Sequence, residues 1–360
     1  MDPGSGLIKA AFGGEDGLRS IFSSLVGTPK MFGLMVGVEQ QERYVGDEAI
    51  AKLENMDFNA PIKRGEVADW EKFETLMHHL FYSEMKVVPE EISILISESP
   101  KASKENRSKL SELLFETFNV QKIHVGNSAM LGLYAYGKTT GLLVDSGFNV
   151  SSSVPVYEGF PLQHASLRMN YGGEDLSLRL LEMIKENLED SYKLIKGRKL
   201  ADSIKEKIGY LALNKDDTFT DEFNYELPDG KILPLKEELY VANEGLFNEE
   251  KNPENLSVQK LIENSLIKCD EDIKNEIKEN ICLTGGTSLL KNFVARLKNE
   301  VSNIQEAEGF NVNNCGERQF STWIGGSIVS SLENFQFMWV SKEEYDESGK
   351  NLLAIESKCF

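Results

Sequence analysis

The sequence predicts an α/β fold made of two similar halves. Residues 142–150 read LLVDSGFNV, in which an apolar run predicts a buried strand and Asp145-Ser146-Gly147 predicts a sharp turn before a second strand-like run. The start of the chain has the same order, because Asp2-Pro3-Gly4-Ser5-Gly6 precedes the strand-like run LIKAAFGG. This repetition of an acid, a small-residue turn and a strand indicates an internal duplication, with one copy in each half.

Tight glycine turns of this kind can hold phosphate. Their backbone N–H groups point at an anion, glycine lets the backbone come close, and an acid before the turn can hold Mg²⁺ through water. A third turn, Thr284-Gly285-Gly286-Thr287, follows the apolar residues 281–283 and precedes a helical run. A Gly-Gly pair at such a junction lets a flat ring lie on the backbone. Together the three turns predict a two-lobed nucleotide clamp.

The composition is ordinary for a globular protein and excludes some functions. The 360 residues are 41% hydrophobic, which is enough for a large core. The net charge of −19 disfavours direct nucleic-acid binding, which needs basic patches. No apolar run reaches the ~18 residues of a membrane span, and no signal-peptide pattern is present. The four cysteines lack metal-ligand spacing and are expected to be reduced thiols.

Local patterns predict several elements of the first half. Apolar residues from Val67 to Phe81 recur at helical spacing behind Asp69, so this run predicts an amphipathic helix. Ser103 and Asn127 stand where they can cap two further helices. The other expected elements are a hairpin at 7–23, a strand at 93–99 and the end of a helix at Gly137.

Nearly the whole chain resembles actin and the actin-related proteins. The matching stretches are MVGVEQQERYVGDEA (35–49), WEKFETLMHHLFYSEMKVVPEE (70–91), LLFETFNV (113–120), LYAYGKTTGLLVDSG (133–147), VPVYEGFPLQHA (154–165), IKEKIGYLAL (204–213), YELPDG (225–230), LTGGTSLL (283–290), WIGGSIVSSLENFQFMWVSKEEYDESG (323–349) and the ending KCF. The resemblance implies the two-lobed α/β fold shared by actins, sugar kinases and chaperone ATPases, with a nucleotide cleft between the lobes.

The resemblance also implies four subdomains. The inner subdomain of the first lobe would take residues 1–23, 61–135 and 321–360, and residues 24–60 would form its small outer subdomain with a mobile loop. In the second lobe, the inner subdomain would take residues 136–171 and 253–320, and residues 172–252 the outer one.

By the same resemblance, the chain should bind ATP or ADP with Mg²⁺. Asp2 and Asp145 match the acids that hold the metal through water, and Lys205 and Glu206 match residues that contact adenine and ribose. The other expected nucleotide-binding residues are Gly4, Ser5, Gly6, Leu7, Lys9, Ser146, Gly147, Asn149, Val150, Gly173, Gly285, Gly286, Thr287 and Leu289.

The residues that the family uses to orient and activate the attacking water are replaced. Ser128 stands at the family's Gln position and Ser152 at its His position, and serine is too short to reach where either would. Phe148 replaces an acid of the second loop, and Asn149 replaces a glycine but tolerates left-handed backbone. Loss of a water-positioning group costs orders of magnitude in rate, so we expect ATP to be bound but hydrolysed very slowly, if at all. Three further departures from the family are Gln319, Leu290 and Arg64.

Two surfaces match the family's contact sites. The loop at 29–37 matches the mobile loop that contacts the next subunit in actin filaments. The alternative is a loop that folds back on its own lobe. Residues 324–339 repeat at helical spacing and resemble the barbed-end cleft, where partner helices dock, with an internal helix pair as the alternative. The expected contact residues are Met31, Phe32, Leu34 and Met35 in the loop, and Tyr134, Val329, Leu332, Phe335 and Met338 in the cleft.

Two other segments depart from the family. Residues 248–257 are polar and charged where actins carry an apolar plug, so we expect a solvated loop there. Ahead of the first turn, the family's acidic tail and first strand have no counterpart in this sequence. The missing tail casts doubt on myosin binding, and the missing strand would cost sheet hydrogen bonds.

Three function hypotheses follow. The leading one is a divergent actin-like cytoskeletal protein that keeps its nucleotide and acts through contacts with itself, actin or actin-binding proteins. It would be a subunit of a larger assembly, such as an axonemal dynein arm or a chromatin remodeller, in the cytoplasm, the nucleus or a cilium. The second is a fast-diverging conventional actin that polymerises. The third, a kinase or ATPase of the same superfold, would need a catalytic acid facing an acceptor, and nothing in the sequence marks one.

Overall fold

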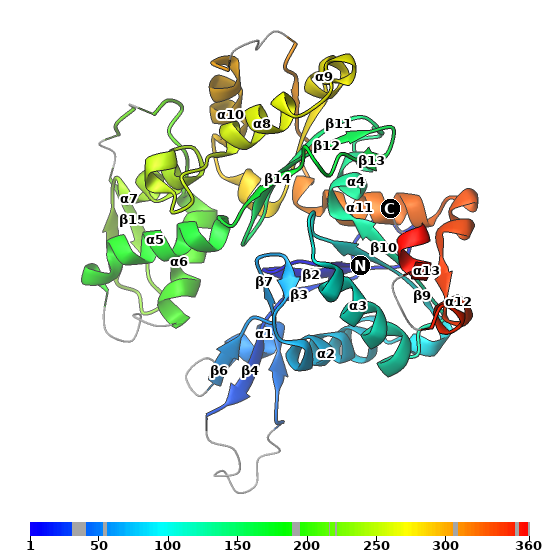
Figure 1. The fold of residues 1–360 in the computed structure, drawn as a ribbon. Coiled ribbons are helices and arrows are strands. Elements are labelled where there is room, and N and C mark those ends of the chain that lie inside the picture. The colour runs from blue at the N-terminus through cyan, green and yellow to red at the C-terminus, as the bar shows by residue number, and fades with distance from the viewer. Residues whose placement is uncertain are drawn as a thin grey trace, which may run out of the picture. The chain divides into compact units, whose positions relative to one another are not determined.

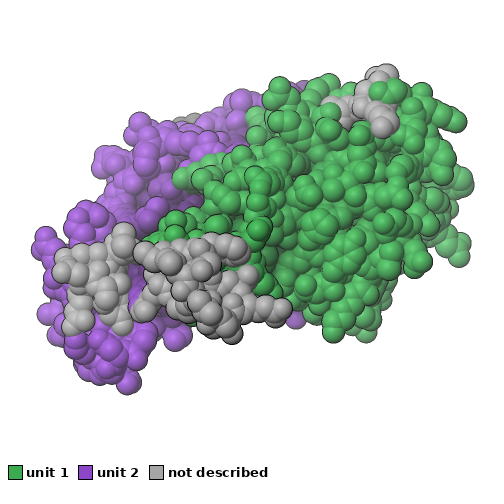
Figure 2. All heavy atoms as spheres, turned by 90° about the horizontal axis from the view of Figure 1, so that it is seen from below, with its two compact units in different colours: residues 1–139, 159–161, 321–360 green, residues 140–158, 162–320 purple. Residues whose placement is uncertain are grey.

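A computed structural model describes residues 1–30, 41–52, 56–188, 195–215, 217–219, 222–304, 309–349 and 353–358. The chain forms two compact units (Figure 2): unit 1 has residues 1–139, 159–161 and 321–360, and unit 2 has residues 140–158 and 162–320. The expected contact residues Met31, Phe32, Leu34 and Met35 lie outside the described residues. Among the described helices, none combines the length and the apolar character needed to cross a bilayer.

Unit 1 contains two three-stranded sheets at its centre and a third three-stranded sheet at residues 26–59 (Figure 1). The central sheets have the orders β1-β2-β3 and β19-β10-β9, and the third sheet has the order β5-β4-β6. The strands are β1 (Asp2–Pro3), β2 (Leu7–Ala10), β3 (Ser20–Ser23), β4 (Val26–Pro29), β5 (Tyr44–Val45), β6 (Met56–Asn59), β7 (Ile62–Lys63), β8 (Glu66–Val67), β9 (Ser93–Glu98), β10 (Lys122–Asn127), β13 (Phe160–Pro161) and β19 (Val340–Ser341).

Three helices of unit 1 begin close to the start signals in the sequence. The side chains of Asp69, Ser103 and Asn127 each accept a hydrogen bond from a backbone N–H of the first helical turn. The predicted caps Ser103 and Asn127 are therefore confirmed, and Asp69, which the sequence placed near the start of α2, is its cap. The hairpin expected at 7–23 is also confirmed, with β2 antiparallel to β3. The helices are α1 (Gly46–Ala51), α2 (Trp70–His78), α3 (Lys104–Glu112), α4 (Ser128–Tyr134), α11 (Ser321–Ser330), α12 (Lys342–Glu347) and α13 (Leu353–Lys358).

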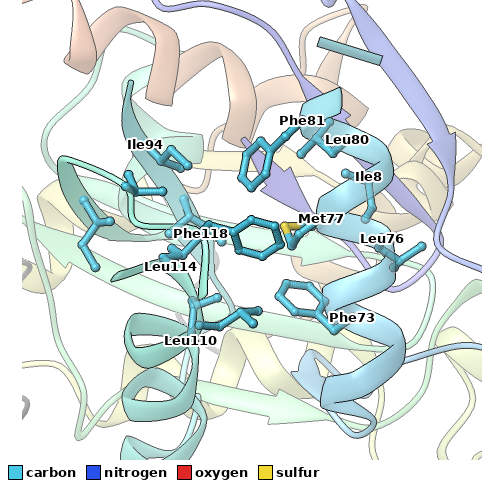
Figure 3. Close-up of a cluster of buried hydrophobic side chains, with 14 of the residues drawn as sticks. Ile8, Phe73, Leu76, Met77, Leu80, Phe81, Ile94, Leu110, Leu114 and Phe118 are labelled. Atoms are coloured by element: carbon cyan, nitrogen blue, oxygen red, sulfur yellow. The ribbon is translucent and has the colours of Figure 1, made fainter. Parts of the chain in front are cut away.

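The main core of unit 1 lies between α2 and α3. Both helices continue as π-helical segments, His79–Met85 and Leu113–Thr117, and their apolar side chains point toward one another (Figure 3). The fully or almost fully buried residues of this core include Ile8, Phe73, Leu76, Met77, Leu80, Phe81, Ile94, Leu110, Leu114 and Phe118. Burial of large side chains like these is the main stabilising contribution to the unit.

The sequence predicted that no strand precedes the first turn, and this expectation is wrong for the two residues directly before Gly4. Asp2 and Pro3 form β1, which pairs with Lys9 and Ile8 of β2. On the other side of this segment, the Met1 carbonyl accepts a hydrogen bond from the Ser97 N–H of β9 over 3.0 Å. Two residues are sufficient here because both neighbouring strands supply hydrogen-bonding partners.

Unit 2 is built on a mixed sheet. Its strands follow the order β12-β11-β17-β18, β14 pairs with β12, and α8 and α9 pack on β12 and β11 (Figure 1). The strands are β11 (Gly141–Ser146), β12 (Ser151–Tyr157), β14 (Leu167–Met169), β17 (Ile281–Thr284), β18 (Val312–Asn313) and the hairpin β15 (Phe223–Glu226) and β16 (Ile232–Leu235). The helices are α5 (Gly173–Ile184), α6 (Ile195–Ile208), α7 (Glu238–Val241), α8 (Val258–Ile267), α9 (Glu271–Lys278) and α10 (Phe293–Ser302).

The expectation of a solvated loop at 248–257 is wrong in part. Asn248 and Asn252 are buried, and the Asn252 amide donates to the Gly245 carbonyl over 3.4 Å. Glu254 accepts a hydrogen bond from the Asn170 backbone N–H over 2.8 Å. Amide side chains can be buried when their polar atoms are bonded, so a polar sequence here forms a docked segment rather than a free loop.

Arg296 of α10 is fully buried among polar partners of unit 2. Its guanidinium donates to both carboxylate oxygens of Glu244 over 3.0 and 3.1 Å, and to the Ala212 carbonyl over 2.9 Å. It also pairs with Glu300 at 2.7 Å and lies over the Phe247 ring. A buried guanidinium is tolerated only when its donors are satisfied in this way.

We predict that Arg296→Met lowers the free energy of unfolding by about 3–5 kcal/mol, because it leaves the buried Glu244 carboxylate without its counter-charge. Urea unfolding followed by circular dichroism measures this loss. Lys260→Ala, which breaks the half-exposed pair with Glu263, is the matched control and should cost no more than about 1 kcal/mol. Equal losses in the two variants would contradict the prediction.

Candidate functional site

The first loop joins β1 to β2 in unit 1. The Gly4 N–H donates to the Leu7 carbonyl over 3.0 Å and closes the turn. Lys9 lies directly across from Asp2 in the strand pair, and the two side chains form an ion pair at 2.9 Å. Burial alone would raise the pKa of the Asp2 carboxyl, but Lys9 and a hydrogen bond from Ser97 outweigh it and hold that pKa below its ordinary value. Asp2 is therefore an anion at neutral pH.

The second loop, in unit 2, repeats the first. Its Gly147 N–H donates to the Val150 carbonyl over 2.9 Å, which is the bond that Gly4 makes to Leu7. Asp145 precedes this turn as Asp2 precedes the other, and it lies directly across from Ser152 on β12. Ser152 thus holds the position that Lys9 holds in the first loop. The duplication inferred from sequence is present in the hydrogen bonds of the two turns.

The backbone of the second loop is oriented by α5. The Gly147 carbonyl accepts from the Gly173 N–H over 3.0 Å and from the Thr287 hydroxyl over 2.8 Å. The Phe148 carbonyl accepts from the Glu174 N–H over 2.7 Å. In a trans peptide the next N–H points opposite to the carbonyl, and the described chain has no cis peptides. The N–H groups of residues 148 and 149 therefore both point away from α5.

The third glycine turn packs against this loop. A Cβ atom on Gly285 would lie 2.3 Å from the Ser146 carbonyl oxygen and 2.4 Å from an Asp145 carboxylate oxygen, and Gly285 has a φ of +89°. Only glycine allows both the contact and this backbone conformation. The next residue, Gly286, has nothing within 4 Å of its Cβ position. The structure thus brings Asp145, Gly147 and Gly285 together.

Lys205 lies near the first turn of α5. Its ammonium donates to the Gly173 carbonyl and the Ser177 hydroxyl, both over 2.6 Å. Burial lowers the Lys205 pKa, and the Asp202 and Glu206 carboxylates oppose that shift. Glu206 itself is exposed, and Leu289 is half-exposed after the third turn. Contacts of Lys205, Glu206 and Leu289 with a nucleotide remain predictions.

The two serines predicted to stand at the family's water-handling positions differ in burial. Ser152 is 2% exposed on β12, and Ser128 is half-buried as the first residue of α4. Within the described residues, no group of three or more His, Cys, Asp or Glu side chains could hold a metal ion. A metal near Asp2 or Asp145 would therefore depend on water and phosphate oxygens, as Mg²⁺ sites commonly do.

A comparison with models of protein families shows the family of this chain. The family model described as Actin matches residues 1–360, the whole sequence. The chain belongs to the actin family. Proteins of the actin family generally bind nucleotide with a divalent metal, and each loop of this actin-family chain, taken by itself, offers groups of the kind that such a ligand needs.

The expected barbed-end contact residues lie on two elements of this actin-family chain. The helical repeat predicted over 324–339 is interrupted: α11 ends at Ser330, and a 3₁₀ helix spans Glu333–Met338. Val329 and Phe335 are buried in a small core with Leu131 and Trp339, against which Tyr134 and Met338 pack in part. Leu332 is 54% exposed. The internal helix pair, formed by α4 and α11, is thus present (Figure 1), and a role of the exposed Leu332 in partner contact remains a prediction.

Phe337 was missed by the sequence analysis. It is 80% exposed, more than any other large hydrophobic residue described. The helical spacing used for residues 324–339 passes over it, because a 3₁₀ helix has three residues per turn and presents different positions. Exposed Leu332 and Phe337 flank the buried Phe335, so an apolar surface follows this turn of the chain.

We predict that His124, buried beneath this surface, makes stability depend on pH. Its Nδ1 lies 3.0 Å from the Met338 carbonyl, its ring packs edge-on against Phe335, and burial lowers its pKa below the ordinary 6.5. At pH values above 6.5 the ring is neutral in both the folded and the unfolded chain, and the free energy of unfolding is at its full value. As pH falls below 6.5, the unfolded chain binds the proton first and stability is lost. Urea unfolding at pH 7.5 and 5.5 should show a smaller loss for His124→Phe than for the natural chain. His164→Phe, at an exposed position, should keep the full loss.

We predict that Gly285→Ala disrupts the second loop, whereas Gly286→Ala is tolerated. The new Cβ at 285 would clash with backbone at 2.3 Å, and the positive φ adds strain, so a loss of at least ~2 kcal/mol is expected. Thermal unfolding of both variants checks this, since Gly286 offers open space to the same methyl group. The same stability in both would show that Gly285 does not pack on the loop.

Proposed function

We propose that this actin-family protein binds ATP with Mg²⁺ through its two loops, hydrolyses it poorly, and acts through protein contacts. The observation that carries the proposal is the repeated loop, with Lys9 across from Asp2 but Ser152 across from Asp145. The repeated turn, with Lys9 across from Asp2, retains groups that can bind phosphate. Ser152, across from Asp145, has only a short hydroxyl at the position where the family has a histidine ring that activates water.

Binding is supported by the backbone. Phosphate contacts through the backbone N–H groups of residues 148 and 149 would need no particular side chain, so the replacement of an acid by Phe148 leaves these donors in place. Asp2 and Asp145 supply carboxylates beside the two turns, the latter against Gly285. When bound, Mg²⁺ would neutralise phosphate charge. ATP held in this way stabilises the folded chain by mass action.

Poor hydrolysis follows from the serines. A general base must come within hydrogen-bond reach of the attacking water and have a suitable pKa, and a serine hydroxyl offers neither. Ser128 could hydrogen-bond a water but is shorter than the glutamine that the family uses. We infer a nucleotide that serves structure rather than turnover.

The contact surface supports a role in an assembly. Proteins of the actin family are generally cytoskeletal and bind one another or actin-binding proteins. Exposed Leu332 and Phe337 present an apolar surface of the kind that receives an amphipathic helix. We propose that the protein works as a subunit of a larger assembly through this surface.

We predict that the purified protein keeps its ATP and stays in the supernatant when sedimented with ATP, Mg²⁺ and salt. In single turnover, Ser128→Gln/Ser152→His should release phosphate at least ~10-fold faster than the natural chain, because each side chain restores a group for the attacking water. Ser331→His, at an exposed position, is the control and should leave the rate unchanged. Pelleting with rapid phosphate release by the natural chain would overturn the proposal and favour a conventional, polymerising actin.

A further inference from the structure

Glu174 holds the second loop at two successive residues. Its N–H donates to the Phe148 carbonyl over 2.7 Å, and its carboxylate accepts a hydrogen bond from the Asn149 side-chain amide. The same carboxylate forms an ion pair with Arg198 of α6. One residue at the start of α5 therefore connects the loop to a second helix of unit 2, and α5 and α6 lie side by side (Figure 1).

Arg198 completes this cluster. Its guanidinium carbon lies 5.8 Å from the centre of the Phe148 ring, within the range of a cation–π contact. The side chains of Arg198 and Glu174 are 35% and 20% exposed, so water screens their charges less than it screens a fully exposed pair. We call Phe148, Asn149, Glu174 and Arg198 the loop clamp.

A carboxylate in this position has a cost for phosphate binding. Glu174 lies next to the turn whose N–H groups would receive the polyphosphate, and like charges at short range repel. The guanidinium of Arg198 cancels that charge. Glu174 can therefore order the loop without repelling the phosphates only while Arg198 is paired with it.

We propose that Glu174 and Arg198 are a positioning pair for the phosphates of the nucleotide. Glu174 fixes the direction of the N–H groups in the second loop, and Arg198 prevents its carboxylate from repelling the ligand. Both act through the loop rather than by touching the reacting atoms. The proposal rests on ATP binding by this loop and adds two residues that the sequence did not single out.

The test is a double-mutant cycle on nucleotide release. The full chain is loaded with a fluorescent ATP analogue and Mg²⁺, and dissociation is followed after adding excess ATP. Arg198→Ala should release the analogue about 10-fold faster, because it leaves the Glu174 charge uncompensated beside the phosphates. Glu174→Gln should stay within about 3-fold of the natural chain, since glutamine still accepts the bond from Asn149. The double variant Arg198→Ala/Glu174→Gln should return to within about 3-fold of the natural rate.

The return of the release rate toward the natural value in the double variant distinguishes a positioning role of Arg198 from a merely structural one. If Arg198 only packed the helices, the double variant would be as fast as Arg198→Ala, and that result overturns the proposal. An unchanged rate in Arg198→Ala overturns it too. Thermal unfolding of each variant checks that it is folded. Glu182→Gln is the control variant: Glu182 lies on α5 and forms an exposed ion pair with Lys185, which follows the helix, so breaking this pair should leave the release rate unchanged. A natural chain that never retains the analogue would overturn ATP binding itself, before any variant is compared.

Discussion

The close approach of α5 to the second loop is the constraint on which the candidate site in unit 2 depends. A Cβ atom on Gly172 would lie 2.7 Å from the Gly147 carbonyl oxygen and 2.8 Å from both the Phe148 carbonyl oxygen and the Val150 nitrogen. No side chain fits there, so the first N–H groups of α5 reach the loop carbonyls. Because those carbonyls point to α5, the following N–H groups point away from it. Backbone packing at glycine thus decides where an anion can bind.

The same packing explains how the loop tolerates changed side chains. Phe148 and Asn149 differ from the family's acid and glycine, yet the turn closes through the Gly147 N–H, which no side chain replaces. Asn149 adds a bond to Glu174, and Phe148 lies beneath Arg198. Under the proposed function, binding and catalysis would therefore depend on different groups. Binding would use backbone groups that survive substitution, whereas hydrolysis needs the reach and pKa of particular side chains.

Charge follows a similar pattern across both units. Three buried or partly buried ions have a partner of opposite sign: Asp2 has Lys9, Glu174 has Arg198, and Arg296 has Glu244. The net charge of −19 is thus carried largely by the surface, where it does not oppose folding strongly. Removing one member of a buried pair costs more than the pair contributes, because the other charge stays behind.

The sequence by itself determined the fold class, the two repeated turns and the helix caps at Ser103 and Asn127, because periodicity and capping are local properties. It also located Ser128 and Ser152 by register from Asp145. Only the tertiary structure decided the docking of 248–257, the break between α11 and the 3₁₀ helix, the exposure of Phe337 and the pairing of Glu174 with Arg198. These depend on contacts between residues far apart in the chain, such as Asn170 with Glu254, which no local pattern records.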